Sequence, residues 1–213
     1  MKVILVNGSP HKEGCTYTAL TEVEKELNAA GIETEIFWLG TKPISGCLGC
    51  GACCRRGPNG EKPSGLCVID DIVNELAPKL EACDGVVVGS PVYYAAANST
   101  LTALLDRLFY STRFDKRMKV GASVAVARRG GCSATFDQLN KYFTISGMPG
   151  ASSQYWNSVH GALAGEAAQD EEGLQTMRTL ANNMVFLMRS IALGKEKYGL
   201  PEKEKFARTN FIR

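Results

Sequence analysis

The sequence predicts an α/β fold in which a doubly wound, five-stranded parallel sheet is covered by helices on both faces. Short apolar runs alternate with segments of helical periodicity along the 213 residues, and the runs are apolar throughout rather than at every second position. Strands of this kind are buried on both faces, as in parallel sheets whose strands are connected by helices. With 45% hydrophobic residues, a chain of this length can bury the core of one domain.

The elements follow in a regular order. Residues 3–7 form an apolar run, and the helix expected at 16–30 ends before Gly31, a residue type that commonly terminates helices. Asp70 or Asp71 is suited to cap the second helix, in which Pro78 predicts a kink or a late start. Further strands are expected at 33–38, 85–89, 120–127 and 152–156, and further helices at 71–82, 99–110, 133–146 and 171–192. Five such units predict a flavodoxin-like architecture, whose ligands bind at the carboxyl ends of the strands.

Residues 40–69, here called the cysteine segment, interrupt this alternation after the second strand. The segment holds five of the eight cysteines, three prolines and seven glycines, a composition typical of an insertion over a sheet edge. We therefore expect one domain at 1–194 that includes this cysteine-rich insertion, followed by a basic tail at 195–213.

Charge and hydropathy exclude several classes of protein. The net charge is +2 with acids and bases interspersed, which gives no basis for nucleic-acid binding. Apolar stretches are too short to span a bilayer, and no signal-peptide pattern follows Met1, so a cytoplasmic protein without membrane association is expected. In a reducing compartment, cysteines serve metal binding, redox chemistry or burial rather than disulfides.

The loop after the first strand predicts a phosphate site. It runs from Gly8 into the first helix, so backbone N–H groups and hydroxyls meet at a helix N-terminus, where the dipole favours an anion. The spacing fits neither a Walker loop nor GxGxxG, and a single monoester phosphate, as in FMN, fits better. The alternative is an ordinary turn before a capped helix. The candidate residues are Ser9, His11, Gly14, Cys15 and Thr16.

Two further loops should meet the first at the same edge of the sheet. The loop after the third strand offers aromatic and apolar groups beside backbone amides, which suit a flavin ring, although its tyrosines could also simply pack. The loop after the fourth strand has paired glycines for close approach and an arginine, although a plain turn fits nearly as well. The candidates are Pro91, Val92, Tyr93 and Tyr94 in one loop, and Ala127, Arg128, Gly130 and Gly131 in the other.

Three motifs together resemble the NADPH-dependent FMN reductase family: Gly8-Ser9-Pro10 through Thr16, Gly89 through Tyr93, and Leu105-Asp106-Arg107. The resemblance implies a flavodoxin-like domain that binds FMN through the three loops. It also implies an FMN-dependent oxidoreductase that takes hydride from NAD(P)H and passes electrons to a flavin, a quinone, an azo or nitro compound, or an iron–sulfur acceptor. One departure is Cys15, where the family commonly has asparagine.

The spacing Cys47-x2-Cys50-x2-Cys53 with Cys67 resembles the iron–sulfur flavoprotein branch of that family and implies a [4Fe–4S] cluster. In that branch the fourth cysteine follows closely behind the third. Here 13 residues separate Cys53 from Cys67, and Cys54 is a rival ligand. Four thiolates would also suit zinc, and a set of reduced thiols without metal is the remaining alternative. Cys83 and Cys132 are expected to be buried apolar residues.

An electron carrier of the flavodoxin kind, which does not oxidise NAD(P)H directly, is the alternative function. Carriers usually dock through a surface of one charge sign, and the near-neutral balance here argues against that. No dedicated catalytic base is expected, because the chemistry belongs to the cofactor. A homodimer or homotetramer is expected because the apolar residues 93–97 lie beside an open flavin face. The aromatic pair Tyr155 and Trp156 is placed at the end of the fifth strand, near the ligand edge.

Overall fold

Five parallel strands form the central sheet of the computed structural model, which describes residues 1–55, 64–205 and 207. Their order is β2-β1-β3-β5-β6, the flavodoxin-like order, so the predicted doubly wound sheet is confirmed. The strands are β1 (Lys2–Asn7), β2 (Glu33–Trp38), β3 (Gly85–Tyr93), β5 (Val120–Ala127) and β6 (Ser158–His160). A sixth strand, β4 (Ala96–Ala97), pairs only with the end of β3, in the antiparallel direction.

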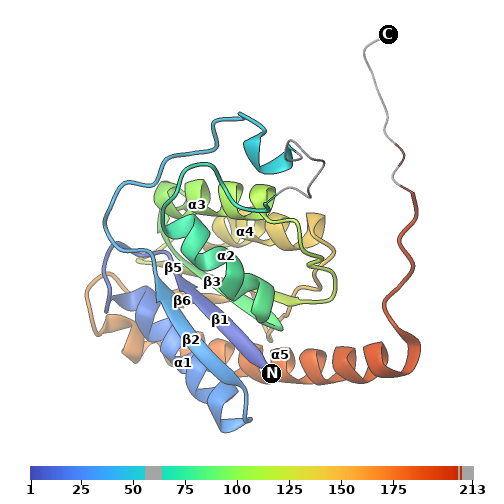
Figure 1. Cartoon of the computed structure of the whole chain (residues 1–213). Helices are drawn as coiled ribbons and strands as arrows, with labels where there is room; N and C mark the ends of the chain where they lie inside the picture. Colours follow the sequence, from blue (N-terminus) through green and yellow to red (C-terminus); the bar gives the residue numbers. More distant parts are fainter. Residues whose placement is uncertain (56–63, 206, 208–213) are drawn as a thin grey trace.

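Helices cover both faces of this sheet (Figure 1). The helices α1 (Cys15–Ala29) and α5 (Glu171–Tyr198) pack on one face. The other face carries α2 (Ile72–Ala82), α3 (Ser99–Ser111) and α4 (Cys132–Ile145). Two short 3-10 helices, η1 (Ala52–Cys54) and η2 (Glu166–Gln169), lie in the connections before α2 and α5. Among the residues that the structure describes, no helix is long and apolar enough to cross a bilayer.

Strand β1 shows why its sequence is apolar throughout. Val3 and Leu5 join the core on the side of α1 and α5, whereas Ile4 and Val6 join the core beneath α2 and α3. Successive side chains of a strand point to opposite faces, so a strand buried on both faces needs an apolar residue at every position.

The predicted fifth strand at 152–156 is wrong: the strand is β6, Ser158–His160. The chain first meets β5 through a single bridge at Gly150, leaves the sheet, and returns to pair at Ser158. The detour is a turn in which the Ser153 hydroxyl donates to the Tyr155 carbonyl (2.6 Å). The exposed aromatic pair Tyr155 and Trp156 therefore precedes the strand and does not lie at its carboxyl end.

The expected late start of the second helix and the predicted end of the last helix also differ from the structure. Pro78 lies inside α2, which begins at Ile72 with the Asp71 carboxylate accepting from the Val73 amide (3.0 Å), so the helix does not start late. Helix α5 continues to Tyr198, beyond the expected end at 192. The division into a domain at 1–194 and a tail at 195–213 stays a prediction.

Candidate functional site

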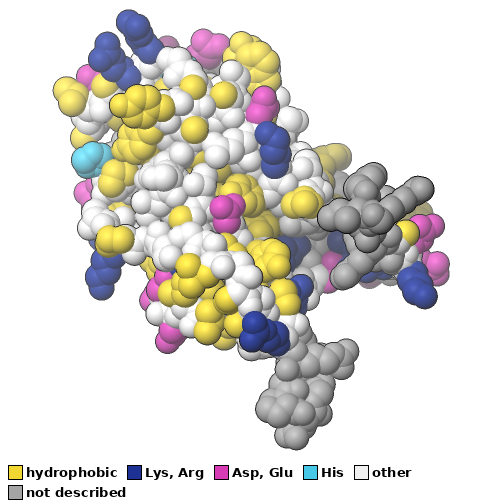
Figure 2. Space-filling model, turned by 90° about the horizontal axis from the view of Figure 1, so that it is seen from above, with side chains coloured by type: hydrophobic (Ala, Val, Ile, Leu, Met, Phe, Trp, Pro, Cys, Tyr) yellow, Lys and Arg dark blue, Asp and Glu magenta, His cyan; other side chains and the backbone are white. Residues whose placement is uncertain are grey.

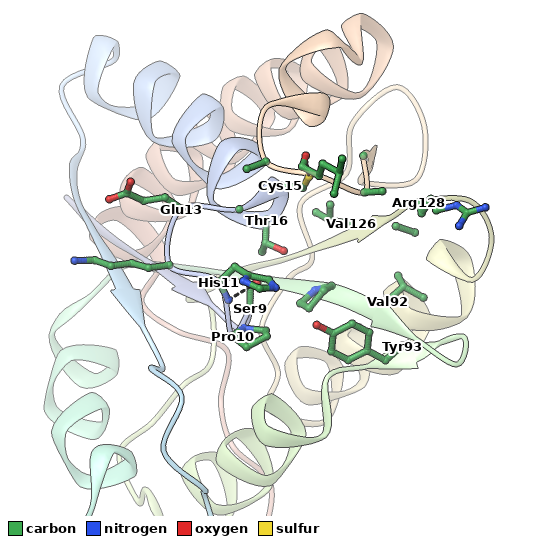
Figure 3. Close-up of a pocket in the computed structure, with 18 of the residues that line it drawn as sticks. Ser9, Pro10, His11, Glu13, Cys15, Thr16, Val92, Tyr93, Val126 and Arg128 are labelled. Atoms are coloured by element: carbon green, nitrogen blue, oxygen red, sulfur yellow. Dashed lines mark hydrogen bonds between the residues drawn. The ribbon is translucent and has the colours of Figure 1, made fainter.

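A cleft of about 780 Å³ lies at the carboxyl edge of the sheet, where the loops after β1, β3, β5 and β6 meet (Figure 3). Its volume is within the range of small-molecule sites. The structure brings most of the predicted ligand residues into this cleft: Ser9, His11, Gly14, Cys15, Thr16, Pro91, Val92, Tyr93, Ala127 and Arg128.

The loop after β1 is held in shape by its own hydrogen bonds. The Ser9 hydroxyl, which is buried, accepts from the amide of His11 (3.1 Å), and the Ser9 amide donates to Asn7 Oδ1 (3.1 Å). The Ser9 carbonyl accepts from the indole N–H of Trp38 at the end of β2 (2.9 Å). These bonds fix the loop before any ligand arrives.

The start of α1 presents unshared donors to the cleft. Gly14 is the N-cap and provides no side-chain cap, and the first turn contains no acidic residue. Thr16 is buried, and its hydroxyl points toward the space above Ser9 and His11, whereas Glu13 points away (Figure 3). The first-turn amides and the positive end of the helix dipole therefore favour an anion here.

Thr16 also fixes how closely α1 approaches the sheet. A Cβ atom on Gly89 of β3 would lie 3.0 Å from Thr16 Cγ2, so the glycine makes room for the threonine methyl. The methyl group therefore packs on the sheet while the hydroxyl faces the cleft.

The β3 side of the cleft is a hairpin, where the sequence predicted a loop after residue 89. Strand β3 continues past Gly89 to Tyr93, and Tyr94 and Ala95 form the turn to β4 with φ of 52° and 59°. Both residues are in the left-handed region, as a two-residue hairpin turn of type I′ requires. Pro91 and Tyr93 line the cleft, but Tyr94 is fully exposed at the tip and does not.

Gly130 and Gly131 also lie outside the cleft lining. Gly131 has φ of 96°, and a Cβ atom there would lie 2.8 Å from the Cα atom of Ala95. This glycine therefore allows the hairpin tip to pack against the start of α4. The side chain of Arg128 extends outward at the rim of the cleft (Figure 3).

The residues after β6 form a wall of the cleft. The Glu166 carboxylate accepts from the amides of Ala162 (2.7 Å) and Leu163 (3.1 Å), and these hydrogen bonds lower the pKa of Glu166. The Cys15 thiol donates to the Leu163 carbonyl (3.1 Å) and so ties this wall to the start of α1.

A second, smaller cavity lies between the cysteine segment and α3. The four predicted metal ligands all line it: Cys47, Cys50, Cys53 and Cys67. Cys47 and Cys50 are exposed, Cys53 is buried, and burial raises the pKa of the Cys53 thiol. Cys54 does not line the cavity, and its sulfur contacts Arg113 instead. In the described part of the chain, no three His, Cys, Asp or Glu side chains are placed to hold a single metal ion.

A model of the family described as NADPH-dependent FMN reductase matches residues 1–162. The chain belongs to this family. FMN is thereby supported as the cofactor, and the cleft fits it. Unshared amides and the Thr16 hydroxyl are suited to bind a monoester phosphate. Tyr93 and apolar side chains are suited to pack beside a flavin ring.

Two relatives of the chain are named iron–sulfur flavoproteins. One, from Methanocaldococcus jannaschii, is 34% identical over 199 residues and matches 90% of this chain and 99% of its own. Another, from Methanosarcina thermophila, is 31% identical over 205 residues and matches 92% of this chain and 100% of its own. Among solved structures, RosB with a bound formylriboflavin-phosphate intermediate has a TM-score of 0.68 at 15% identity, covering 100% of this chain and 94% of its own, which shows the shared fold.

Sequence reasoning missed part of the cleft. Trp38 ends β2 at the edge where all the parallel strands end, so applying the strand-end rule to β2 would have found it. The wall after β6 was missed because the fifth strand was placed too early. Pro10, Lys12 and Glu13 lie within the predicted phosphate loop without being named as ligands, and the remaining unpredicted lining residues are Val126, Gly161, Ala162, Leu163 and Ala164.

Proposed function

We propose that this flavin oxidoreductase takes hydride from NAD(P)H on FMN and passes electrons to an iron–sulfur cluster held by Cys47, Cys50, Cys53 and Cys67. The observation that carries the proposal is the gathering of these four cysteines around one cavity, in a chain whose FMN cleft lies at the carboxyl edge of the sheet. A free flavin, a quinone, or an azo or nitro compound would serve as an external acceptor.

The residues of the cleft would bind and orient FMN rather than donate or accept protons. The Thr16 hydroxyl and the first-turn amides of α1 would hold the phosphate, and Pro91 to Tyr93 would line the ring. Bound FMN supplies the hydride-accepting and electron-transferring chemistry. The cleft is partly open to solvent, which leaves room for a nicotinamide to approach.

The cysteine cavity suits a cluster better than a zinc ion. A tetrahedral zinc site draws four sulfurs around one atom, and the described residues show no such tight group. A [4Fe–4S] cluster takes one thiolate at each of its four irons, and four cysteines are among the residues that line this cavity. When bound, the cluster supplies one-electron transfer.

An anaerobic titration with NADPH and NADH tests the proposal. We expect either nucleotide to bleach the flavin absorption of the purified protein, and iron and acid-labile sulfide to be present in equal amounts. If dithionite bleaches the flavin but neither nucleotide does, the protein is an electron carrier. The names of the iron–sulfur flavoprotein relatives keep that alternative open.

We also propose that the protein is a homodimer or homotetramer. Tyr93 and Tyr94 on the β3–β4 hairpin are exposed, as are Tyr155 and Trp156. Figure 2, which views the molecule from above, shows groups of hydrophobic side chains on the surface of the molecule. Light scattering of the FMN-loaded protein at micromolar concentration tests this proposal, and a monomeric mass would contradict it.

A further inference from the structure

Arg107 of α3 is completely buried, and every N–H of its guanidinium group has an acceptor. Nη1 and Nη2 bind the two carboxylate oxygens of Asp71, at 2.7 and 3.0 Å. Nη1 also donates to the Ser45 carbonyl (3.3 Å) and Nη2 to the Ile69 carbonyl (2.9 Å). The remaining donor, Nε–H, points to the sulfur of Cys67 (3.3 Å). A guanidinium has five N–H donors, so this side chain is saturated.

Two of these acceptor residues, Cys67 and Ile69, line the cysteine cavity together with Arg107 itself. Ser45 precedes Cys47, and Ile69 follows Cys67, so Arg107 holds the chain on both sides of the cysteines. Asp71, which neutralises the buried charge, also caps α2. A single side chain thus joins α3, the start of α2 and both ends of the cysteine segment.

We infer that Arg107 positions Cys67 and raises the reduction potential of the cluster through its Nε–H···S hydrogen bond. The inference rests on the proposed function, in which Cys67 is a cluster ligand. The step it affects is the transfer of one electron from reduced FMN to the oxidised cluster, in which no bond forms or breaks. Reduction adds negative charge to the cluster and its thiolates, and a donated hydrogen bond stabilises that charge.

The double variant R107M/D71N isolates the hydrogen bond. Removing arginine alone would leave the Asp71 carboxylate unpaired, whereas the double change removes the pair together and keeps the net charge constant. The substituted side chain still caps α2, because asparagine and aspartate cap helices equally well. The matched control is D71N, which keeps the N–H···S bond and removes only the negative charge.

Potentiometric titration of the anaerobic FMN-loaded protein, followed by electron paramagnetic resonance, measures the midpoint potential of the cluster. For R107M/D71N we expect the ratio of reduced to oxidised cluster at a fixed potential to fall about tenfold. The flavin midpoint should not move. For D71N we expect the midpoint potential of the cluster to stay unchanged or to rise, whereas in R107M/D71N it should fall. A double variant that retains iron and has the wild-type cluster midpoint overturns the inference.

A second measurement does not depend on the fold of the variant. In wild-type protein grown with arginine labelled with ¹⁵N at Nε only, pulsed electron paramagnetic resonance of the reduced cluster should detect a coupled ¹⁵N. Arg55 and Arg113 also lie near cysteines, so their lysine variants should keep the signal. Absence of coupling in the wild type overturns the inference even if the variants lose iron. Wild-type protein without iron after anaerobic reconstitution overturns the proposed cluster, and this inference with it.

Discussion

The FMN cleft and the cysteine cavity are built in different ways. The cleft is formed by loops at the ends of paired strands, so the sheet places its residues, and the ladder hydrogen bonds of five strands maintain it. In the described part of the cysteine segment, the regular structure is the three-residue η1, and the segment crosses over α3 (Figure 1). Its position depends on a few side chains, chiefly Arg107 and Asn74. A site on a sheet edge should therefore tolerate single substitutions better than a site on such a segment.

Loss of one cysteine should have the largest effect. We expect Cys50→Ser to remove both iron and acid-labile sulfide, which should be roughly four of each per chain in the wild type for a [4Fe–4S] centre. FMN should remain bound in stoichiometric amount, because its loops belong to the sheet edge. Metal analysis and the flavin spectrum of anaerobically purified protein measure both.

Cys132→Ser is the matched control for that change. Cys132 begins α4 and lies outside the cysteine cavity, so its serine variant should keep the full iron content. Equal iron in the Cys50→Ser and wild-type proteins would mean that Cys50 is no ligand, and zinc in place of iron would make the site structural.

A smaller effect is expected at Asn74 of α2. Its side chain accepts from the Cys67 amide and donates to the Cys67 carbonyl, both at 2.9 Å. Asn74→Ala removes both bonds and should cost about 1–3 kcal/mol of folding free energy, with faster loss of iron to a chelator. Denaturant unfolding and the rate of iron release measure the two effects. Asn183→Ala, which removes one exposed bond from α5, should change neither by a comparable amount.

A loss of FMN affinity, similar in size to the effect at Asn74 or smaller, is expected for a substitution in the cleft. Thr16→Val keeps the methyl group that packs beside Gly89 but removes the hydroxyl, so FMN affinity should fall by about 1 kcal/mol or more, the usual scale for a hydrogen bond to a charged group. Fluorescence titration of the apoprotein with FMN measures it. Thr21 lies farther along α1, and its hydroxyl donates to the Tyr17 carbonyl. The Thr21→Val variant should therefore bind FMN as the wild type does. An unchanged affinity for Thr16→Val would mean that the phosphate lies elsewhere.

The same contrast explains what the sequence could predict. The strands β1, β3 and β5 are buried on both faces, so their apolar runs are unambiguous, and the rule for strand ends then locates most of the cleft. Strand β6 is a three-residue pairing at the edge of the sheet, and the nearby aromatic residues Tyr155 and Trp156 imitate a strand while lying exposed in a turn. A pattern read along the chain cannot distinguish these two cases.

The role of Arg107 could not be predicted for a different reason. The sequence places it in the Leu105-Asp106-Arg107 motif but does not indicate its partners Ser45, Cys67 and Asp71, which lie 36 to 62 residues away. The cysteine spacing predicted that four thiols could meet. Nothing in the spacing indicated that a buried cation on α3 would contact the sulfur of Cys67.

The smallest expected effect concerns Cys83, which ends α2 and belongs to the core. Burial raises the pKa of its thiol to about 11, and the sulfur lies 3.2 Å from the Leu80 carbonyl, as a donor does. Because the thiolate is the reactive form, roughly one molecule in ten thousand carries it at pH 7, and burial limits access further. In iron-free protein treated with iodoacetamide, mass spectrometry should find Cys47 and Cys50 modified while Cys83 stays unmodified until the protein is unfolded. Equal rates at the three thiols would show that Cys83 is accessible and that the core and the cysteine segment do not differ in this respect.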